Sequence, residues 1–423
     1  MGGTGTCPVM IDAATMGRYV TELGSRGEQP GGGLLRPQYS EAWVQARDLL
    51  ADWMRDAGLE VRHDSVGNLF GRLVGRDDRR TILTGSHIDT VRLGGKYDGA
   101  LGVLTGLAAL AALRAQAGTP ARSLEVVALC EEEGSRFHAS YFGSRAILGL
   151  LGGTDFNGLR DEEGVTLAQA MHEVGLDPAR YRESVRHEID AFLELHIEQG
   201  PVLYEAGTDI GVVTGITALC WQTVTVTGRA DHAGTTPMDA RRDALQGAAR
   251  MALEIAAVAQ RRGRPAVATI GMWQVRPGGA NIVPQQVTFS VDMRHPDDAE
   301  LAAMVTELRA RCDEVAQAEG LGLDTEMIKR EAPAPTDPRL QQVLAEAAET
   351  CEASWRHMPS GAGHDSQLFA RHLPSAMLFV PSVDGRSHSA AEYTPDEACA
   401  LGARVLATAL HRLAYACVEN SGE

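Results

Sequence analysis

Short apolar runs alternate with helical stretches along the first part of the chain, and this alternation constrains the fold more than any other feature. Residues Asn68–Leu73, Thr81–Leu83 and Leu124–Leu129 are strand-like, and Gly102–Leu113 is predicted to form an apolar helix between the last two. Strands that alternate with helices indicate an α/β protein with a mostly parallel sheet. Further predicted strands of this sheet are Phe192–Leu195 and Met377–Val380.

The middle of the chain has a different order of elements. Trp221–Thr227 alternates with a period of two, as a half-buried strand does. The segments that follow are a helix at Asp243–Arg261, strands at Val267–Val275 and Val287–Met293, a helix at Asp298–Glu319 and a strand at Leu321–Ile328. This β-α-β-β-α-β order is the ferredoxin-like pattern. Glycine-rich Gly207–Gly215 and the segment Ala332–Pro335 flank it and are typical of linkers.

We therefore predict an α/β catalytic domain that is discontinuous in sequence, made of residues 1–210 and 331–423. A smaller ferredoxin-like α+β domain is inserted at residues 211–330. The chain has 423 residues, which agrees with two or three domains at about 150 residues each.

The charge balance excludes some classes of partner. With 39 basic and 56 acidic residues, the formal net charge is −17. Such a surface disfavours nucleic acids and anionic membranes, because both would be repelled. A small anionic substrate remains compatible if local Arg or Lys groups reverse the field.

Three features favour a cytoplasmic protein. The opening MGGTGTCPVMIDAATMGRYV lacks the basic and apolar regions of a secretory signal. The longest apolar stretch, Gly99–Leu113, is shorter than the roughly 20 residues of a membrane-spanning helix, so we expect a buried core helix. The 7 cysteines are scattered and form no CxxC pair, which indicates a reducing compartment.

The segment LTGSHIDTVRLGGKYDGALGV, residues 83–103, carries the strongest local signal. His87 directly follows a short strand, and Asp98 lies in a glycine-rich loop before the apolar helix. Imidazole and carboxylate groups bind zinc, cobalt, nickel and manganese. We expect the Asp89 carboxylate to fix the tautomer of His87. The alternative is an ordinary turn, since Asp and Gly are common in turns.

Other predicted strands also end in groups that bind metals. EVVALCEEEGSRF ends a strand in Glu131–Glu133, AFLELHIEQGPVL places His196 after Leu195, and His388 lies in the loop after the last strand. Ligands bind at the carboxyl ends of strands in open α/β sheets, so these groups should converge. Several acids with several histidines indicate two metal ions, which need a bridging carboxylate to hold them about 3.5–4 Å apart. Asp98 is the candidate bridge, and one further Glu must stay off the metals as a general base.

The predicted inserted domain has a second group of candidate residues. His232 lies in GRADHAGTTPM, Asn281 in PGGANIVP, and Arg294 ends a strand in FSVDMRHP. Arg grips a carboxylate with two hydrogen bonds, and His and Asn can stabilise an oxyanion. We expect the loops of Asn281 and Arg294 to converge on one anionic, amide-bearing substrate. The alternative is a surface His, a turn Asn and a solvated Arg.

Motifs of other enzyme classes are absent. The sequence has no GxxxxGK[ST] phosphate loop and no GxSxG nucleophile elbow. No GxGxxG follows a strand and opens a helix. Nucleotide chemistry and serine hydrolysis are therefore not expected.

Taken together, the motifs resemble those of a known family. They are GSHIDTV, GGKYDGALGVL, EEEGSRF, ELHIEQGPVL, DHAGTTPM, ARRDAL, GGANIVP, SGAGHDSQ and SHSAAE. The set is similar to the M20 peptidase-like binuclear metal amidohydrolases, and more narrowly to their hydantoinase/carbamoylase branch. This branch includes allantoate amidohydrolases, N-carbamoyl-L-amino-acid hydrolases and β-ureidopropionases.

The resemblance implies a role for each matching residue. Two divalent metal ions (Zn, Mn, Co or Ni) would be held by His87, Asp98 as the bridge, Glu133, His196 and His388. Glu132 would be the general base. The triple acid leaves Glu131 with Glu132 as an alternative pair, but Gly directly after the ligand favours Glu132 with Glu133. Substrate-binding residues would be Gln199, His232, Asn281, Arg294 and Gly363, with His364 close by.

The resemblance also implies partners and a reaction. The small domain of the family is a lid and dimerisation surface, and a partner subunit of a homodimer can complete the site. The substrate would be a small anionic ureido acid cleaved at its ureido C–N bond. EEEGSRFHASYFGSRAILGL lacks the Gly-Ala-Gly run that often follows the Phe in carbamoylases, and with MPSGAGHDSQLFA it looks more like the allantoate amidohydrolases. The other branch members, an M20-type peptidase and an inactive binding protein remain alternatives.

Overall fold

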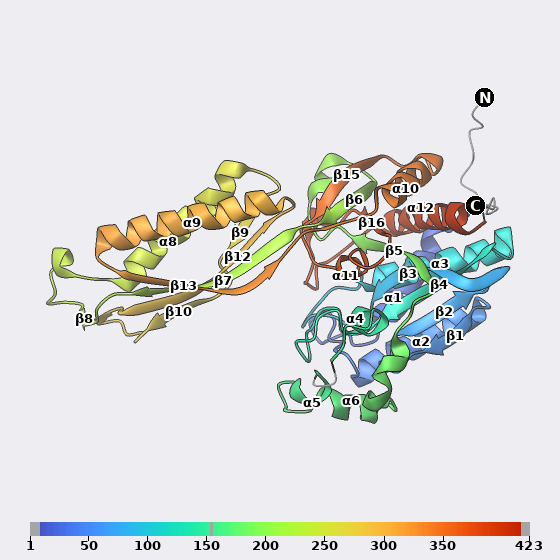
Figure 1. Cartoon of the computed structure of the whole chain (residues 1–423), viewed down its shortest axis with the longest axis horizontal. Coiled ribbons are helices and arrows are strands. Elements are labelled where there is room, and N and C mark those ends of the chain that lie inside the picture. The colour runs from blue at the N-terminus through green and yellow to red at the C-terminus, as the bar shows by residue number, and fades with distance from the viewer. Residues whose placement is uncertain (1–8, 153–154, 416–423) are drawn as a thin grey trace. The chain divides into compact units, whose positions relative to one another are not determined.

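The computed structural model describes residues 9–152 and 155–415. Cys7, Cys417 and the first eight residues of the chain lie outside this range. The chain divides into two compact units (Figure 1). Unit 1 comprises Met1–Thr214, Pro335–Met358 and His364–Glu423, and unit 2 comprises Gly215–Ala334 and Pro359–Gly363.

Unit 1 is built around a mixed sheet, which has nine strands within the described residues. In sheet order these are β1 (Glu60–His63), β2 (Leu69–Leu73), β4 (Arg122–Leu129), β3 (Asp77–His87), β5 (Ile189–Ile197), β16 (Ser375–Val380), β6 (Ile210–Ile216) and β14 (Ala334–Pro335), with β15 (Trp355–Ser360) paired to β6. The central strands β4, β3, β5 and β16 are parallel, while β2 and β6 pair antiparallel at their flanks. The predicted parallel sheet is therefore confirmed at its centre.

Helices cover both faces of this sheet (Figure 1). The helices of unit 1 are α1 (Ala13–Gly24), α2 (Glu41–Asp56), α3 (Ala100–Ala117), α4 (Phe142–Ile147), α5 (Asp155–Gly158), α6 (Leu167–Glu173), α7 (Val202–Ala206), α10 (Pro338–Thr350), α11 (Ser366–Phe369) and α12 (Asp396–Tyr415), with 3-10 turns at Pro178–Ser184 and Val383–Gly385. Ser40 caps the start of helix α2, because its hydroxyl accepts a hydrogen bond from the Trp43 amide at 3.2 Å.

Helix α3 is apolar on all sides, as expected for a helix buried in a protein core. Within the described part of the chain it alone is long and apolar enough to cross a membrane, judged by length and composition. It packs against β3, β4 and α12, and 67% of it is buried. The prediction of a buried core helix is confirmed.

Unit 2 contains an antiparallel sheet, five-stranded in the described residues, in the order β10-β12-β7-β13 with β9 paired to β12. Its strands are β7 (Ala218–Thr227), β9 (Val267–Thr269), β10 (Trp273–Arg276), β12 (Gln286–His295) and β13 (Gly322–Glu331), beside a small pair, β8 (Asp231–His232) and β11 (Ile282–Val283). Its helices are α8 (Ala244–Arg262) and α9 (Asp298–Glu319), with a 3-10 turn at Met238–Ala240.

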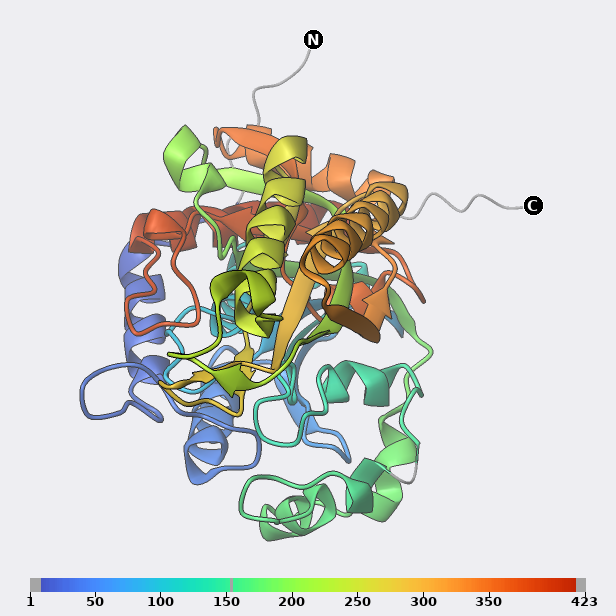
Figure 2. The same cartoon turned by 90° about the vertical axis from the view of Figure 1, so that its left-hand side faces the viewer.

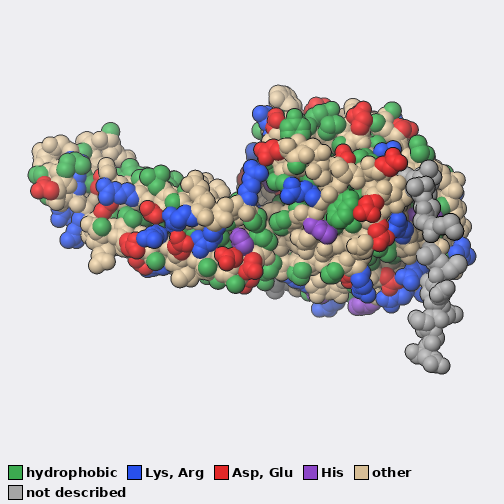
Figure 3. Space-filling view, turned by 90° about the horizontal axis from the view of Figure 1, so that it is seen from above, with side chains coloured by type: hydrophobic (Ala, Val, Ile, Leu, Met, Phe, Trp, Pro, Cys, Tyr) green, Lys and Arg blue, Asp and Glu red, His purple; other side chains and the backbone are tan. Residues whose placement is uncertain are grey.

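Helices α8 and α9 lie side by side on one face of this sheet (Figures 1 and 2). They bury residues such as Met251, Ile255 and Leu308 against Val224 and Phe289, which gives unit 2 a core of its own. Acidic and basic side chains alternate on the face of unit 2 displayed in Figure 3. Arg250–Glu319 and Arg261–Glu307 are among the ion pairs of these two helices.

The predicted strand at residues 267–275 is split into β9 and β10, with Ile270–Met272 between them. None of the cysteines in the described range forms a disulfide.

Candidate metal centre

The central strands of unit 1 deliver three groups of candidate ligands at one edge of the sheet. His87 is the last residue of β3, and it pairs with Leu129, the last residue of β4. Glu131, Glu132 and Glu133 follow directly after β4. His196 lies near the end of β5. Because the strands are parallel and in register, these side chains meet at the same place.

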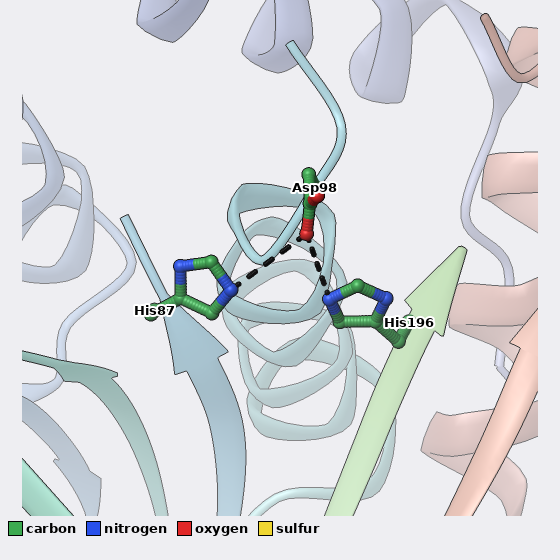
Figure 4. A group of neighbouring side chains, drawn as sticks. All are labelled: His87, Asp98 and His196. Atoms are coloured by element: carbon green, nitrogen blue, oxygen red, sulfur yellow. Dashed lines mark ion pairs between the residues drawn. The ribbon is translucent and has the colours of Figure 1, made fainter. Parts of the chain in front are cut away.

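Asp98 enters this edge from the loop before α3 and lies between the two histidines (Figure 4). Its Oδ1 atom is 3.2 Å from His196 Nε2 and 3.7 Å from His87 Nε2. Gly99 makes this approach possible, because its φ is +63° and a Cβ there would lie 2.3 Å from His87 Nε2. Asp98 thus presents one oxygen to two imidazoles at once.

The second oxygen of Asp98 faces a different set of groups. Asp98 Oδ2 lies 3.2 Å from His388 Nε2, and accepts hydrogen bonds from Gln199 Nε2 at 3.0 Å and Ser387 Oγ at 3.1 Å. His388 Nε2 is also 3.6 Å from Glu133 Oε1. One carboxylate therefore joins two donor groups, His87–Asp98–His196 and Asp98–Glu133–His388.

The composition and spacing of these donors fit a pair of divalent cations. Within each group the donor atoms lie within 4.8 Å of one another, which is a span that one ion can bridge. Imidazole and carboxylate are the ligand types of Zn, Mn, Co and Ni sites. A carboxylate with one oxygen in each group is the arrangement that a two-metal site requires.

Electrostatics at the site also favour cations. Burial, reinforced by the negative charge of Asp98, raises the pKa of Glu133 to about 8. Burial and the adjacent Glu133 raise the pKa of Glu132 well above its usual value. Burial lowers the pKa of His87 to about 4, so this imidazole is neutral and can act as a ligand. Crowded, buried carboxyl groups carry a desolvation and repulsion penalty that a bound cation offsets.

The three consecutive acids have separate positions. Glu131 turns away, since its Oε1 accepts hydrogen bonds from the amides of Arg136 and Phe137 at 3.1 and 2.8 Å. Glu132 Oε2 lies 3.6 Å from His87 Nε2, and Glu133 lies beside His388. Glu131 thus shapes the loop, while its two neighbours face the metal-binding groups.

The predicted role of the Asp89 carboxylate is wrong. His87 Nδ1 lies 3.0 Å from the backbone carbonyl oxygen of Asp89, and that carbonyl fixes the tautomer. The Asp89 carboxylate is 3.7 Å from the ring and instead accepts hydrogen bonds from the amides of Glu132 and Glu133, each at 3.2 Å.

Gln199 and His364 lie beside these groups in unit 1. Gln199 has a φ of +59° and donates to the Asp98 carboxylate. The buried ring of His364 packs edge-on against His196, with ring centres 4.4 Å apart. Gly363 is half-buried at the end of the short segment Pro359–Gly363 of unit 2.

His232 and Asn281 are neighbours in unit 2. Residue Ile282 of β11 pairs with His232 of β8, and the carbonyl of Asn281 accepts a hydrogen bond from the Ala233 amide at 3.0 Å. His232 Nδ1 accepts hydrogen bonds from the amides of Gly234 and Thr235, at 3.0 and 3.2 Å. The ring proton therefore sits on Nε2, which makes that exposed atom a donor.

Arg294 lies at the opposite end of unit 2's sheet, and the expected convergence with Asn281 is wrong. Strand β12 spans roughly 26 Å from Gln286 to Arg294 at about 3.3 Å per residue, and Asn281 lies before the start of this strand, next to β11. The Arg294 guanidinium donates to the Asp292 carboxylate at 2.8 Å and to the Gly361 carbonyl at 2.8 Å. The two residues are near in sequence, but an extended strand keeps them apart.

Two residues at the metal-binding groups were not among the candidates from sequence. Ser387 donates to Asp98, and Glu392 accepts hydrogen bonds from the amides of Tyr97 and Asp98. Both belong to the SHSAAE motif, so the motif itself was the available signal.

Comparisons with known proteins agree with this geometry. The model of the peptidase family M20/M25/M40 matches residues 83–412. Allantoate amidohydrolase from Escherichia coli (strain K12) is 41% identical over 398 residues, covering 93% of this chain and 96% of that protein. N-carbamoyl-L-amino acid amidohydrolase from Geobacillus stearothermophilus is 40% identical over 409 residues, covering 96% of this chain and 99% of that protein.

A solved structure is similar over the same extent. The crystal structure of a hydantoinase/carbamoylase family amidase from Burkholderia ambifaria has a TM-score of 0.88 and 39% identity, and covers 96% of this chain and 98% of its own. The resemblance predicted from the motifs is thereby confirmed. Matched along most of its length by the family model and by these relatives, the chain belongs to the peptidase family M20/M25/M40.

Proposed function

We propose that this protein is a two-metal amidohydrolase that cleaves the ureido C–N bond of a small carboxylate. Its proposed substrate is allantoate, which with water gives ureidoglycine, ammonia and carbon dioxide. The observation that carries the proposal is the Asp98 carboxylate, whose Oδ1 lies 3.2 Å from His196 and whose Oδ2 lies 3.2 Å from His388. The similarity to an allantoate amidohydrolase supports the choice of substrate.

The ligands in this proposal are His87, Asp98, Glu133, His196 and His388. Zn, Mn, Co or Ni ions bound there would polarise the carbamoyl carbonyl and lower the pKa of the attacking water. Glu132 takes the proton of that water and delivers it to the leaving nitrogen. Burial and the adjacent Glu133 raise the pKa of Glu132, and a raised pKa makes a carboxylate a stronger base toward that water.

In this proposal the substrate is bound by residues that can donate hydrogen bonds to its oxygen atoms. We propose that Arg294 grips the substrate carboxylate, with Gln199, Gly363 and His364 near the reacting group. The proton on His232 Nε2 suits donation to the oxygen that gains charge during the reaction. Asn281 lies beside His232 and would share that role.

The distance between the candidate substrate residues of unit 2 indicates that one active site takes residues from two subunits. His232 and Asn281 lie at one end of the sheet and Arg294 at the other, so one substrate of small size cannot bridge them. We propose a homodimer in which a partner subunit supplies His232 and Asn281. The inserted ferredoxin-like domain that we place at residues 211–330, which contains most of unit 2, would then act as lid and dimerisation surface.

The decisive experiment compares substrates. Ammonia release is measured with the purified, metal-loaded protein on allantoate and on a panel of N-carbamoyl-L-amino acids and β-ureido acids, with dipeptides alongside. A clear preference for allantoate in kcat/KM is expected. N-carbamoyl-L-amino-acid hydrolysis is the second candidate, because a relative of that activity is 40% identical. Preference for a dipeptide, or metal binding without turnover, would contradict the proposal.

A second experiment tests the shared site. His232→Ala and Glu132→Gln chains are each inactive in this scheme, but a mixed dimer contains one site with both intact residues. Mixed dimers purified after co-expression of the two tagged chains should therefore have about half of the wild-type activity, because one of their two sites is intact. No recovery in purified mixed dimers would show that His232 acts within its own chain.

No nucleic-acid or membrane partner enters this scheme, and a small acid of purine catabolism is consistent with a cytoplasmic enzyme.

A further inference from the structure

Glu392 lies where two loops of unit 1 meet, and it is 6% exposed. Its Oε1 atom accepts hydrogen bonds from the amides of Tyr97 and Asp98, at 2.9 and 3.0 Å. These are the peptide groups that carry the proposed bridging carboxylate. The side chain fits there because residue 95 is glycine, where a Cβ would lie 2.1 Å from Glu392 Oε1.

The other oxygen of Glu392 binds the loop that carries His388. Glu392 Oε2 accepts a hydrogen bond from Ser387 Oγ at 2.9 Å, one residue before His388. His388 itself has a φ of +51° and a side chain that is 51% exposed. A non-glycine residue in this conformation stays there only when its surroundings hold it.

The two donor groups differ in what fixes them. His87 and His196 are held by the hydrogen bonds of the central sheet, since they belong to β3 and β5. His388 lies on a loop outside any strand or helix, so its distance from Asp98 depends on side-chain contacts. Glu392 is the side chain that binds both the Asp98 backbone and the neighbour of His388.

We infer that Glu392 is a positioning residue that fixes Asp98 relative to His388. It thereby sets the affinity of the metal position formed by Asp98, Glu133 and His388, and leaves the position at His87 and His196 largely unchanged. This inference rests on the metal centre of the proposed function.

The groups that donate hydrogen bonds to Glu392 determine which substitutions of Glu392 test its role. Ser387 has one hydroxyl proton but lies within reach of two carboxylates, Glu392 at 2.9 Å and Asp98 at 3.1 Å. In Glu392→Gln the amide oxygen still accepts both backbone N–H groups, and the amide nitrogen donates to Ser387. Glu392→Ala removes the link altogether.

The test is a metal titration of the full-length protein after removal of bound metal with a chelator. Co²⁺ is added to the wild type, Glu392→Ala, Glu392→Gln and the exposed control Glu397→Ala, and binding is followed by calorimetry and by the visible absorption of Co²⁺. His388→Ala and His196→Ala identify which of two binding events belongs to which position.

In Glu392→Ala the affinity at the His388 position should fall about 10- to 100-fold, as for other groups that orient ligands. The His196 position should keep its affinity, and Glu392→Gln and Glu397→Ala should match the wild type. Equal weakening of both positions would mean a general loss of structure and would overturn the inference, as would unchanged binding. Absence of two-ion binding in the wild type would overturn the proposed function as well.

If Glu392→Ala does not fold, Glu392→Asp decides the question, because the shorter carboxylate cannot reach Ser387 and the amides of Tyr97 and Asp98 together. Weaker binding confined to the His388 position would support the inference, and unchanged affinity there would overturn it.

Discussion

The candidate residues of the two units differ in how deeply they are buried and in how close they lie to one another. In unit 1, His87 and His196 are 2% and 1% exposed and belong to neighbouring strands of one sheet. In unit 2, His232 and Asn281 are exposed and lie at the far end of the sheet from Arg294. The imidazoles of His87 and His196 are thus held in place by the sheet itself. The candidate substrate residues each have a defined conformation but no common pocket within their own unit.

This difference separates two kinds of requirement. Ligands of a metal ion need distances fixed within tenths of an ångström, and a sheet supplies them. Groups that recognise a substrate must be reached by it and then shielded from water, which an exposed loop allows only when another surface covers it. We therefore expect loss of a metal ligand in unit 1 to alter metal content, and changes to the candidate substrate residues of unit 2 to alter kinetics without changing metal content.

The largest effect is expected for Asp98→Ala. This change removes the carboxylate that joins the two donor groups. Two cations bound there would then repel each other with no negative charge between them. We expect the loss of at least one metal ion per chain and of nearly all activity. Elemental analysis and ammonia release measure both, and full metal occupancy in the variant would contradict the bridging role.

Next in size is Glu132→Gln, which keeps the shape of the side chain and removes the basic oxygen. Turnover should fall about 10²–10⁴-fold, as for loss of a general base, while metal stays bound. Glu133→Gln is the matched comparison and should lose metal, because Glu133 lies 3.6 Å from His388. The reverse pattern would exchange the roles of the two acids.

Arg294→Lys tests unit 2. A lysine cannot reproduce the two-pronged grip of a guanidinium. KM for the carboxylate substrate should rise about 10- to 100-fold, since hydrogen bonds to charged groups contribute about 1.5–3 kcal/mol. Metal content should not change, and kcat should fall less than KM rises. A wild-type KM would place the substrate carboxylate elsewhere.

The smallest effect concerns stability. Asp297 begins α9 in unit 2 and Asp337 begins α10 in unit 1, and each carboxylate accepts hydrogen bonds from two helix amides. Replacing either with Ala should lower stability by about 1 kcal/mol. Because each unit has its own core, Asp297→Ala should affect only the transition reported by Trp221 and Trp273. Denaturant titrations followed by tryptophan fluorescence would reveal a single shared transition if the units unfold together.

The sequence predicted the fold best where local pattern and long-range topology agree. The strand-like run Leu124–Leu129 ends in acids, and its partner strand ends in His87, so parallel pairing alone brings these groups together. The start of α2 was also predictable, because Ser40 is a strong N-terminal cap. These features depend on neighbours in sequence and on one general rule of parallel sheets.

The sequence could not predict which residues of the candidate site lie close together in space, because this depends on the path of the backbone between them. Asn281 and Arg294 are close in sequence, yet β12 lies between them. His87 Nδ1 contacts the backbone carbonyl of Asp89 instead of its carboxylate, and residue types do not reveal which of the two oxygens a ring nitrogen meets. Glu392 is nearly 300 residues from Asp98 in sequence, and only the folded loops bring the two together.

The ion pair between Arg294 and Asp292 has one more consequence. The guanidinium that is proposed to hold the substrate is already bound to a carboxylate of its own strand, with a nitrogen–oxygen distance of 2.8 Å. A substrate carboxylate must therefore compete for Arg294 with the Asp292 carboxylate, which has a high effective concentration because it belongs to the same strand. A neutral ureido compound has no carboxylate to replace that of Asp292, whereas a ureido acid has one. Asp292 would then lower the affinity of Arg294 for every carboxylate that has no further contacts with the protein.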